Sequence, residues 1–194
     1  MTISPILFAA SGLVGALFLS FSACASESSK PIIEGEARVY DGDSIFMGRV
    51  EIRLNAIDAP EMAQACRFDD GTFWPCGVAG RDSLREMVNG KRVRCEIEGV
   101  DKYKRLLGIC SVEGRDINAA MVQTGMASAY HYFSERYAPQ EAQAKAEKIG
   151  IWQDAGFTEP YYCRHPQKGK RCWRWDDKKQ TGIRNREPMV GASK

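Results

Sequence analysis

Residues 37–61, ARVYDGDSIFMGRVEIRLNAIDAPE, place acidic residues at the junctions between short apolar runs. Runs 37–40 and 44–47 flank Asp41-Gly42. An Asp-Gly dipeptide between strand-like runs is a strong hairpin signal, because glycine accepts the positive φ that a tight turn needs. A third run, 50–57, carries Arg53 and ends at Asp58. Three strands in this order would bring Asp43, Asp58 and Arg53 together, which predicts a hard-cation site with an anion-binding group beside it.

A structural explanation of the same charges stays open at this point. Aspartate is common in turns, which would explain Asp41, and Asp58 before Ala-Pro can simply end a strand. Asp43 and Arg53 are harder to explain in this way, because charges inside strand patterns lose solvation unless they find partners. The pattern alone therefore permits both a carboxylate site and a set of unrelated turns.

The distribution of charge divides the chain. Its 194 residues suffice for one domain with a sizeable core and additional segments, and its composition, 44% hydrophobic and 27% charged, is ordinary for a globular protein. Residues 161–194 hold 10 Lys/Arg and 3 Asp/Glu, whereas the rest holds 17 basic and 22 acidic residues. A basic end beside an acidic body fits a polyanionic partner and fits equally a solvated tail with no partner.

The N-terminus has the character of an export leader. Residues 6–21 are apolar, and no charged residue precedes Glu27. Ala23-Cys24-Ala25 fits a small-residue cleavage site, although a positive n-region is missing. The sequence FSAC at 21–24 also resembles a bacterial lipobox. We expect residues 1–25 to be a signal peptide or a lipoprotein leader, with an uncleaved anchor as the third alternative. Each places the protein outside the cytoplasm, with membrane attachment only through a lipid on Cys24 in the second case.

The cysteines after this leader fit an oxidising compartment. They are six, an even number, which favours disulfides and allows 15 connectivities. A zinc site is the competing interpretation, but CxxC spacing is absent and the chain has only two histidines. The short loops and adjacent strand-like runs favour sequential pairing, which would join Cys66 to Cys76, Cys95 to Cys110, and Cys163 to Cys172.

The remaining patterns predict an alternation of strands and helices. A polar linker at 26–35 leads into the three strands, and a loop at 62–77 follows them. A helix is expected at 78–88, two strands at 91–97 and 105–112, a helix at 116–124, and another from about 134 or 139 to 149. Five strands with a helix after the third match a small Greek-key barrel, although strand count alone also allows SH3-like barrels and open α+β sheets.

The motifs DGDS…RLNAIDAPE, DKYKR at 101–105 and EAQAKAEKIGIW at 141–152 together closely resemble the thermonuclease (staphylococcal nuclease-like) family. The resemblance covers about residues 35–155 and implies an α+β fold, a five-stranded OB-fold barrel with about three packed helices. We therefore expect a family domain at 36–155 and a basic, cysteine-containing extension at 156–194.

The resemblance also implies roles for particular residues. It implies a Ca²⁺ site with two carboxylate ligands and one backbone carbonyl, a general base and two phosphate-binding arginines. These are Asp43, Asp58 and Ala59 for the metal, Glu61 for the base, and Arg53 and Arg105 for the phosphate. Ala59 stands where the family usually has threonine, and Ser44 likewise replaces a common threonine. Without the resemblance, Arg105 would be assigned to a simple ion pair with Asp101.

The resemblance also implies nucleotide contacts at Lys102 and Tyr103, in a loop where Lys104 replaces a frequent glycine. Tyr130 and Tyr132 match aromatic positions near the family's site, and either line a nucleotide pocket by stacking or cover the end of the barrel. His131, between them, is assigned no chemistry.

The extension has two interpretations. A Cys163–Cys172 hairpin would carry Arg164, Lys168, Lys170 and Arg171 near tryptophans, which suits single-stranded nucleic acid, and ordinary surface charge is the alternative. Residues 181–194 are expected to be disordered.

These observations predict an exported, calcium-dependent nuclease that acts on DNA and RNA with little sequence preference and needs no stable protein partner. Two alternatives remain. The first is a nucleic-acid-binding module with weakened catalysis. The second is a thermonuclease-like protein that serves exopolysaccharide (succinoglycan) biosynthesis, a role that gene neighbourhood would reveal and these residues do not.

Overall fold

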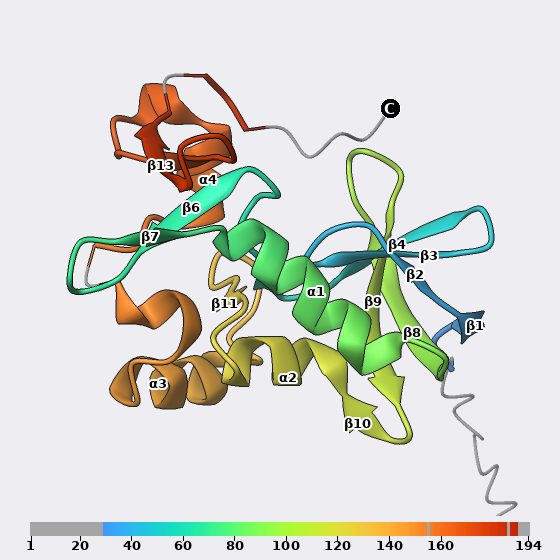
Figure 1. The fold of residues 1–194 in the computed structure, drawn as a ribbon. Coiled ribbons are helices and arrows are strands. Elements are labelled where there is room, and N and C mark those ends of the chain that lie inside the picture. Colours follow the sequence, from blue (N-terminus) through green and yellow to red (C-terminus); the bar gives the residue numbers. More distant parts are fainter. Residues whose placement is uncertain (1–28, 155, 186, 190–194) are drawn as a thin grey trace, which may run out of the picture.

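The computed structural model describes residues 29–154, 156–185 and 187–189. It is a mixed α+β fold in which four α-helices pack beside curled sheets (Figure 1). The N-terminal leader expected at 1–25, with Cys24, lies outside the described residues. Within the described residues, no helix is both long and apolar enough to cross a membrane.

The main sheet is built from all five strands that the sequence predicts, together with further short strands. Its ladder runs β1-β8-β9-β4-β3-β2, with β10 attached to β9. Most pairs are antiparallel, but β4 and β9 are parallel, with Ile52 opposite Leu106. The strands are β1 (Ile32–Glu36), β2 (Arg38–Val39), β3 (Ser44–Met47), β4 (Val50–Leu54), β8 (Arg92–Val100), β9 (Leu106–Val112) and β10 (Arg115–Asp116).

The two ends of this ladder are neighbours in the chain. Strands β1 and β2 are separated only by Ala37, yet β1 pairs with β8 and β2 pairs with β3. The sheet therefore curls round so that one stretch of chain serves both edges. The linker expected at 26–35 is thus wrong for residues 32–35, because pairing with β8 makes them a strand.

Three helices lie where periodicity predicts them. They are α1 (Cys76–Val88), α2 (Ile117–Gln123) and α3 (Ala138–Ala146), and Asp116 caps α2 by accepting a hydrogen bond from the backbone of Ala119 at 2.9 Å. The apolar faces of α1 and α2 pack on the sheet around fully buried side chains such as Ile45, Leu84 and Met121, and α3 packs against α2. The short 3₁₀ helix η1 (Gly150–Gln153) follows α3. The extension holds the helix α4 (Pro160–Arg164) and the short 3₁₀ helix η2 (Pro166–Lys168).

The extension is joined to the body by a second sheet of order β13-β12-β6-β7. Here β6 (Gln64–Arg67) and β7 (Phe73–Trp74) come from the segment predicted as a loop at 62–77, which is therefore a hairpin in part. From the extension come β12 (Trp173–Asp176) and β13 (Thr181–Arg184), so residues 181–184 are ordered, contrary to expectation. In Figure 1 the orange and red C-terminal elements accordingly lie beside β6.

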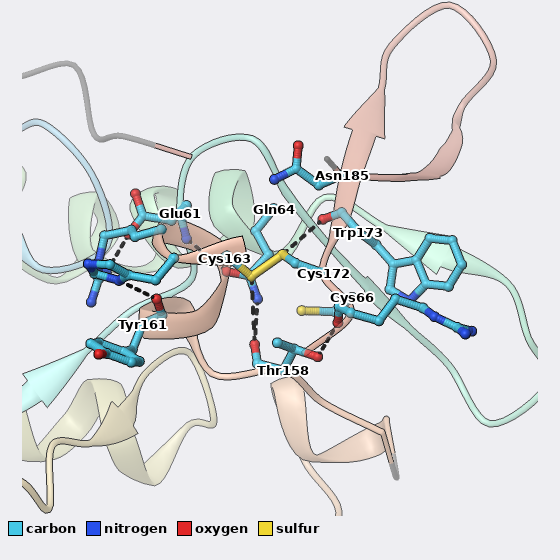
Figure 2. Close-up of a disulfide and its surroundings, with 12 residues drawn as sticks. Glu61, Gln64, Cys66, Thr158, Tyr161, Cys163, Cys172, Trp173 and Asn185 are labelled. Carbon is cyan, nitrogen blue, oxygen red and sulfur yellow. Dashed lines mark hydrogen bonds and ion pairs between the residues drawn. A yellow bond between two sulfur atoms is a disulfide. The ribbon is translucent and has the colours of Figure 1, made fainter. Parts of the chain in front are cut away.

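All three sequential disulfides are present, as the spacing favours. Cys95 and Cys110 face each other across β8 and β9, within the core. The Cys163–Cys172 disulfide is buried. The hairpin that the sequence analysis expected between these two cysteines is not formed. The disulfide instead connects α4 to the start of β12 (Figure 2).

Candidate active site

The first acidic group, Asp43, lies where the chain enters β3. The β3–β4 register sets Ser44 opposite Arg53, which brings the Asp43 carboxylate to the Arg53 guanidinium. Gly42 does not adopt the positive φ expected of it. Its role is close packing, because a Cβ there would lie 2.6 Å from the Cβ of Ala59. The glycine therefore lets the 41–43 turn approach the strand that carries the second acidic group.

The second acidic group, Asp58, ends the two-residue strand β5 (Ile57–Asp58). This strand pairs with β11 (Ser128–Ala129), and the Ser128 hydroxyl donates to the backbone carbonyl of Asp58 at 3.0 Å. The next residue, Ala59, donates its backbone N–H to Oδ2 of Asp43 at 2.9 Å. These hydrogen bonds fix the backbone that carries Asp58 beside the Asp43 carboxylate.

The guanidinium of Arg53 links the two aspartates. Its Nη1 donates to Oδ1 of Asp43 and its Nη2 donates to Oδ1 of Asp58, both at 2.7 Å. Asp43 and Asp58 are 3% and 2% exposed. Burial lowers the pKa of the Arg53 guanidinium, but the two carboxylates more than offset this and raise it above its ordinary value. The structure therefore brings Asp43, Asp58, Ala59 and Arg53 together, as the 37–61 motif predicts.

Glu61 lies beside this cluster on a tightly packed piece of backbone. A Cβ on Gly77, at the start of α1, would come within 1.8 Å of the Glu61 carbonyl oxygen, so only glycine fits there. The buried Gln64 accepts a hydrogen bond from the Glu61 backbone at 3.1 Å and donates to the Thr158 carbonyl at 2.9 Å. The backbone of Glu61 is thereby fixed between α1 and the extension.

Arg164 of the extension also enters this site, which the sequence analysis missed. Its Nη1 and Nη2 donate to the two carboxylate oxygens of Asp58 at 3.1 and 2.9 Å, and Nη1 also donates to Oε1 of Glu61. In the sequence, Arg164 is distinguished only by its position next to Cys163 and two tyrosines and near other basic residues. No local pattern could reveal a contact that spans more than 100 residues.

The cluster carries more acidic than basic groups. Asp41, Asp43, Asp58 and Glu61 face the two guanidiniums of Arg53 and Arg164. Burial, followed by the charge of Asp43, raises the pKa of Asp41 to about 7. Burial also raises the pKa of Glu61 to about 7, although Arg164 opposes this rise. Both pKa shifts reflect burial first, and the charges of neighbouring carboxylates add to it.

Within the described residues, the Arg105 side chain forms its hydrogen bond and ion pair inside its own loop and not with the carboxylate cluster. Its Nε and Nη2 both lie 2.7 Å from Oδ2 of Asp101, the pairing that residues alone suggest, and its guanidinium lies 5.4 Å from the Tyr103 ring centroid. Lys104 has a φ of 68°, so the lysine itself adopts the left-handed conformation for which glycine is usual. The loop thus makes its turn despite the substitution.

A cavity of about 560 Å³ opens next to Asp58. Three of the four predicted substrate-binding residues meet at this cavity, whereas Tyr103 is 65% exposed and does not line it. The extension contributes two further aromatic side chains that the sequence analysis did not assign. The lining includes Lys102, Tyr130, Tyr132, Tyr161 and Tyr162.

His131 also lines this cavity and bridges two glutamates, so it has a structural role. Its Nδ1 and Nε2 lie 2.8 Å from carboxylate oxygens of Glu135 and Glu141. Hydrogen bonds to Glu141 and to Glu135 raise the pKa of His131 above its ordinary value of 6.5. Its contribution to stability is therefore fully present below pH 6.5 and is lost as the pH rises through the folded-state pKa.

A His131→Gln variant should therefore be less stable than the wild type at pH 5.5 and nearly equal at pH 8.5. Because the side chain is 45% exposed, solvent screening limits the difference in unfolding free energy to about 1 kcal/mol. Urea unfolding at the two pH values measures it. A deficit of the same size at both would show that the charge of His131 contributes nothing.

Within the described residues, no group of three or more His, Cys, Asp or Glu side chains is arranged to hold a metal ion. A cation at this cluster would therefore be held by two aspartates, by backbone oxygen and by water. Oxygen ligands of this kind suit Ca²⁺, which tolerates flexible coordination and bound water.

Comparisons with known proteins agree on one family. The model of the family described as staphylococcal nuclease homologue matches residues 51–154. The chain is 34% identical to a succinoglycan biosynthesis protein, ExoI, of Rhizobium meliloti over 73% of each chain. It is 31% identical to an uncharacterized endonuclease of Haemophilus influenzae, over 78% of this chain and 82% of the relative. It is 32% identical to a micrococcal nuclease of Shigella flexneri, over 68% of this chain and 79% of the relative.

Proposed function

We propose that this chain, which belongs to the staphylococcal nuclease homologue family, is an exported, calcium-dependent nuclease that hydrolyses phosphodiester bonds of DNA and RNA. The observation that carries the proposal is the Arg53 guanidinium between Asp43 and Asp58, with Glu61 beside them. Relatives named as endonuclease and micrococcal nuclease support the same reaction class. By family analogy the products carry 3′-phosphates.

The carboxylates retain the capacity to bind a cation. A carboxylate offers about four lone-pair sites. Asp58 accepts three hydrogen bonds, from Arg53 and Arg164, and Asp43 also accepts three, from Arg53, Ser44 and Ala59. Each aspartate therefore keeps about one site. When all four carboxylates are ionised, the two guanidiniums leave a net charge of −2, which a divalent cation would neutralise.

We assign Asp43, Asp58 and the backbone carbonyl of Ala59 as the protein ligands of Ca²⁺. Bound calcium would neutralise the charge of the phosphodiester and orient it. Glu61 is the general base that takes a proton from the attacking water. Arg53 and Arg105 donate to the phosphoryl oxygens as negative charge builds on them. Arg53 has N–H donors beyond the two that the aspartates use, so it can serve both partners.

The cavity next to Asp58 is the proposed nucleotide site. Tyr130, Tyr132 and Tyr161 offer faces for base stacking, and Lys102 offers a positive charge to a terminal phosphate. Stacking accepts every base, because each has a π-face, and this agrees with little sequence preference. Tyr103, exposed beside Arg105, contacts substrate only if the substrate extends over this loop.

Fold and compartment complete the proposal. The closure of the main sheet through β1 and β2, with β4 parallel to β9, supports an OB-type barrel with the carboxylates at one end. Three disulfides support an oxidising compartment and thus an exported protein. The match to a succinoglycan biosynthesis protein favours a second candidate, service in an exopolysaccharide pathway, in which the same site would act.

The proposal is tested on the purified full chain with end-labelled single-stranded DNA and RNA of one sequence. With calcium, we expect ladders of products from both, with 3′-phosphates that block polymerase extension until phosphatase removes them. Binding that survives chelation without any cleavage would instead support the binding-module alternative. Cleavage of DNA alone or of RNA alone would contradict the proposed action on both.

A further inference from the structure

Arg164 connects the extension to the two most important acidic groups of the proposed site. It is the last residue of α4, and its side chain is only 22% exposed. Both of its Nη atoms bind the Asp58 carboxylate, and Nη1 also binds Glu61. A forked, permanently charged contact of this kind fixes geometry as well as charge. Burial lowers the pKa of Arg164, but Asp58 and Glu61 more than offset this and raise it.

The surrounding structure fixes Arg164 from several directions. The buried Cys163–Cys172 disulfide anchors the preceding residue to the start of β12, which pairs with β6. The backbone of Met189 donates to the Cys163 carbonyl at 3.0 Å. In Figure 2, Glu61 and Tyr161 lie on one side of this disulfide and Trp173 lies on the other. The extension is therefore built so that Arg164 reaches the acidic cluster in one place.

Glu61 is bound to the extension at two points. Its carboxylate accepts from Arg164, and its backbone N–H donates to Gln64, whose amide donates in turn to Thr158 just before α4. The contact uses Oε1 of Glu61, and no hydrogen bond involves Oε2 in the part of the chain that the structure describes. One oxygen is thus held while the other remains available to a water molecule.

We propose that Arg164 is a positioning residue of the nuclease site: its guanidinium holds the Glu61 carboxylate beside Asp58, so that the extension completes the site. This inference rests on the proposed function. Within the described residues, the hydrogen bonds of the Arg164 side chain go to the carboxylates of Asp58 and Glu61, and Arg164 does not line the adjacent cavity. Its effect should therefore fall on the chemical step and not on substrate binding.

The main alternative is that Arg164 acts as an inhibitory plug that competes with the cation. The contacts favour positioning, because Arg164 leaves about one lone-pair site on Asp58 and one whole oxygen of Glu61. With Arg164 present and all four carboxylates ionised, the carboxylates, the two arginines and one divalent cation sum to zero charge. Without Arg164, the same loaded site would carry −1 and would repel the phosphodiester.

The test compares Arg164→Gln and Arg164→Lys with the control Arg174→Gln. Arg174 is an exposed arginine of β12, so its substitution makes the same charge change in the same extension. We expect Arg164→Gln to lower kcat about 10²-fold, the cost of a misplaced catalytic group, and to change KM less than about twofold. Arg164→Lys should recover about tenfold of this loss, because it restores charge without the fork. The control should match the wild type.

A second readout does not depend on activity. Calorimetric titration of calcium into the metal-free protein should give a dissociation constant about threefold or more lower for Arg164→Gln than for the wild type, because a positive charge beside Asp58 is gone. Tighter calcium binding with slower cleavage is the signature of positioning. Circular dichroism and a thermal melt establish that each variant is folded.

The outcomes separate this inference from the proposed function. If the wild type cleaves and folded Arg164→Gln cleaves equally well, the positioning role is wrong and the proposed function stands. If Arg164→Gln cleaves faster, Arg164 is an inhibitory plug. An equal loss in Arg174→Gln would show a general effect of positive charge. If the wild type itself cleaves nothing with calcium, the proposed function fails and the positioning role fails with it.

Discussion

Replacing Arg53 with alanine is expected to slow phosphodiester cleavage by about 10³-fold and to lower the unfolding free energy of the metal-free protein by about 3–5 kcal/mol. The large rate effect follows from losing a bidentate donor to the phosphoryl oxygens. The stability effect follows because both aspartates are nearly fully buried: Asp43 would lose the Arg53 ion pair, and Asp58 would keep Arg164. Single-turnover cleavage and urea unfolding measure the two effects.

Calcium should restore part of the lost stability in this variant, because a cation that binds only the folded state replaces the missing charge. Arg53→Lys, which keeps a charge without the fork, separates loss of activity from loss of folding. Arg49→Ala is the matched control, since Arg49 is exposed in the β3–β4 turn. If Arg53→Ala proved as stable as this control and as active as the wild type, the central role of the Arg53 guanidinium between Asp43 and Asp58 would be wrong.

Replacing Glu61 with glutamine is expected to lower kcat by about 10²–10⁴-fold, the usual contribution of a general base. KM should change little, because in our assignment Glu61 contacts the attacking water and not the phosphate. The variant should remain folded, since the amide oxygen can still accept from Arg164 and a neutral group is easier to bury than a carboxylate. Single-turnover rates at saturating enzyme isolate this chemical step.

The matched control for Glu61→Gln is Glu86→Gln, which removes one exposed carboxylate from α1. It should leave the rate unchanged. A Glu61→Gln rate within twofold of the wild type would assign the base to another group. The raised pKa of Asp41 would then make it the next residue to replace.

The parts of the site that lie within 37–61 could be predicted because they are local. Three successive strands and their turns fix where Asp43, Arg53 and Asp58 fall, and the β3–β4 register follows from one short hairpin. The reason for Gly42 could not be predicted from turn chemistry. It depends on Ala59, which approaches only after the third strand has folded back.

The contribution of the extension could not be predicted, because it depends on pairing between distant short strands. Strands β6 and β7 have four and two residues, too few to show an alternation of apolar and polar side chains. The pairing of β6 with β12 fixes the position of α4 and hence of Arg164. Similarly, residues 32–36, IIEGE, are too short to show a strand pattern and form a strand by pairing with β8.

The central claim is that the cluster of Asp43, Asp58, Arg53 and Glu61 cleaves nucleic acid with a bound calcium ion. The most direct measurement is the rate at which the metal-stripped full chain cleaves a fluorescent single-stranded oligodeoxynucleotide as calcium is added back. We expect no cleavage before calcium is added and a saturable rise in rate afterwards, with no such rise in folded Asp58→Asn. Equal cleavage in excess chelator, or none at any calcium concentration by the folded protein with its disulfides intact, would contradict the calcium-dependent role of this cluster.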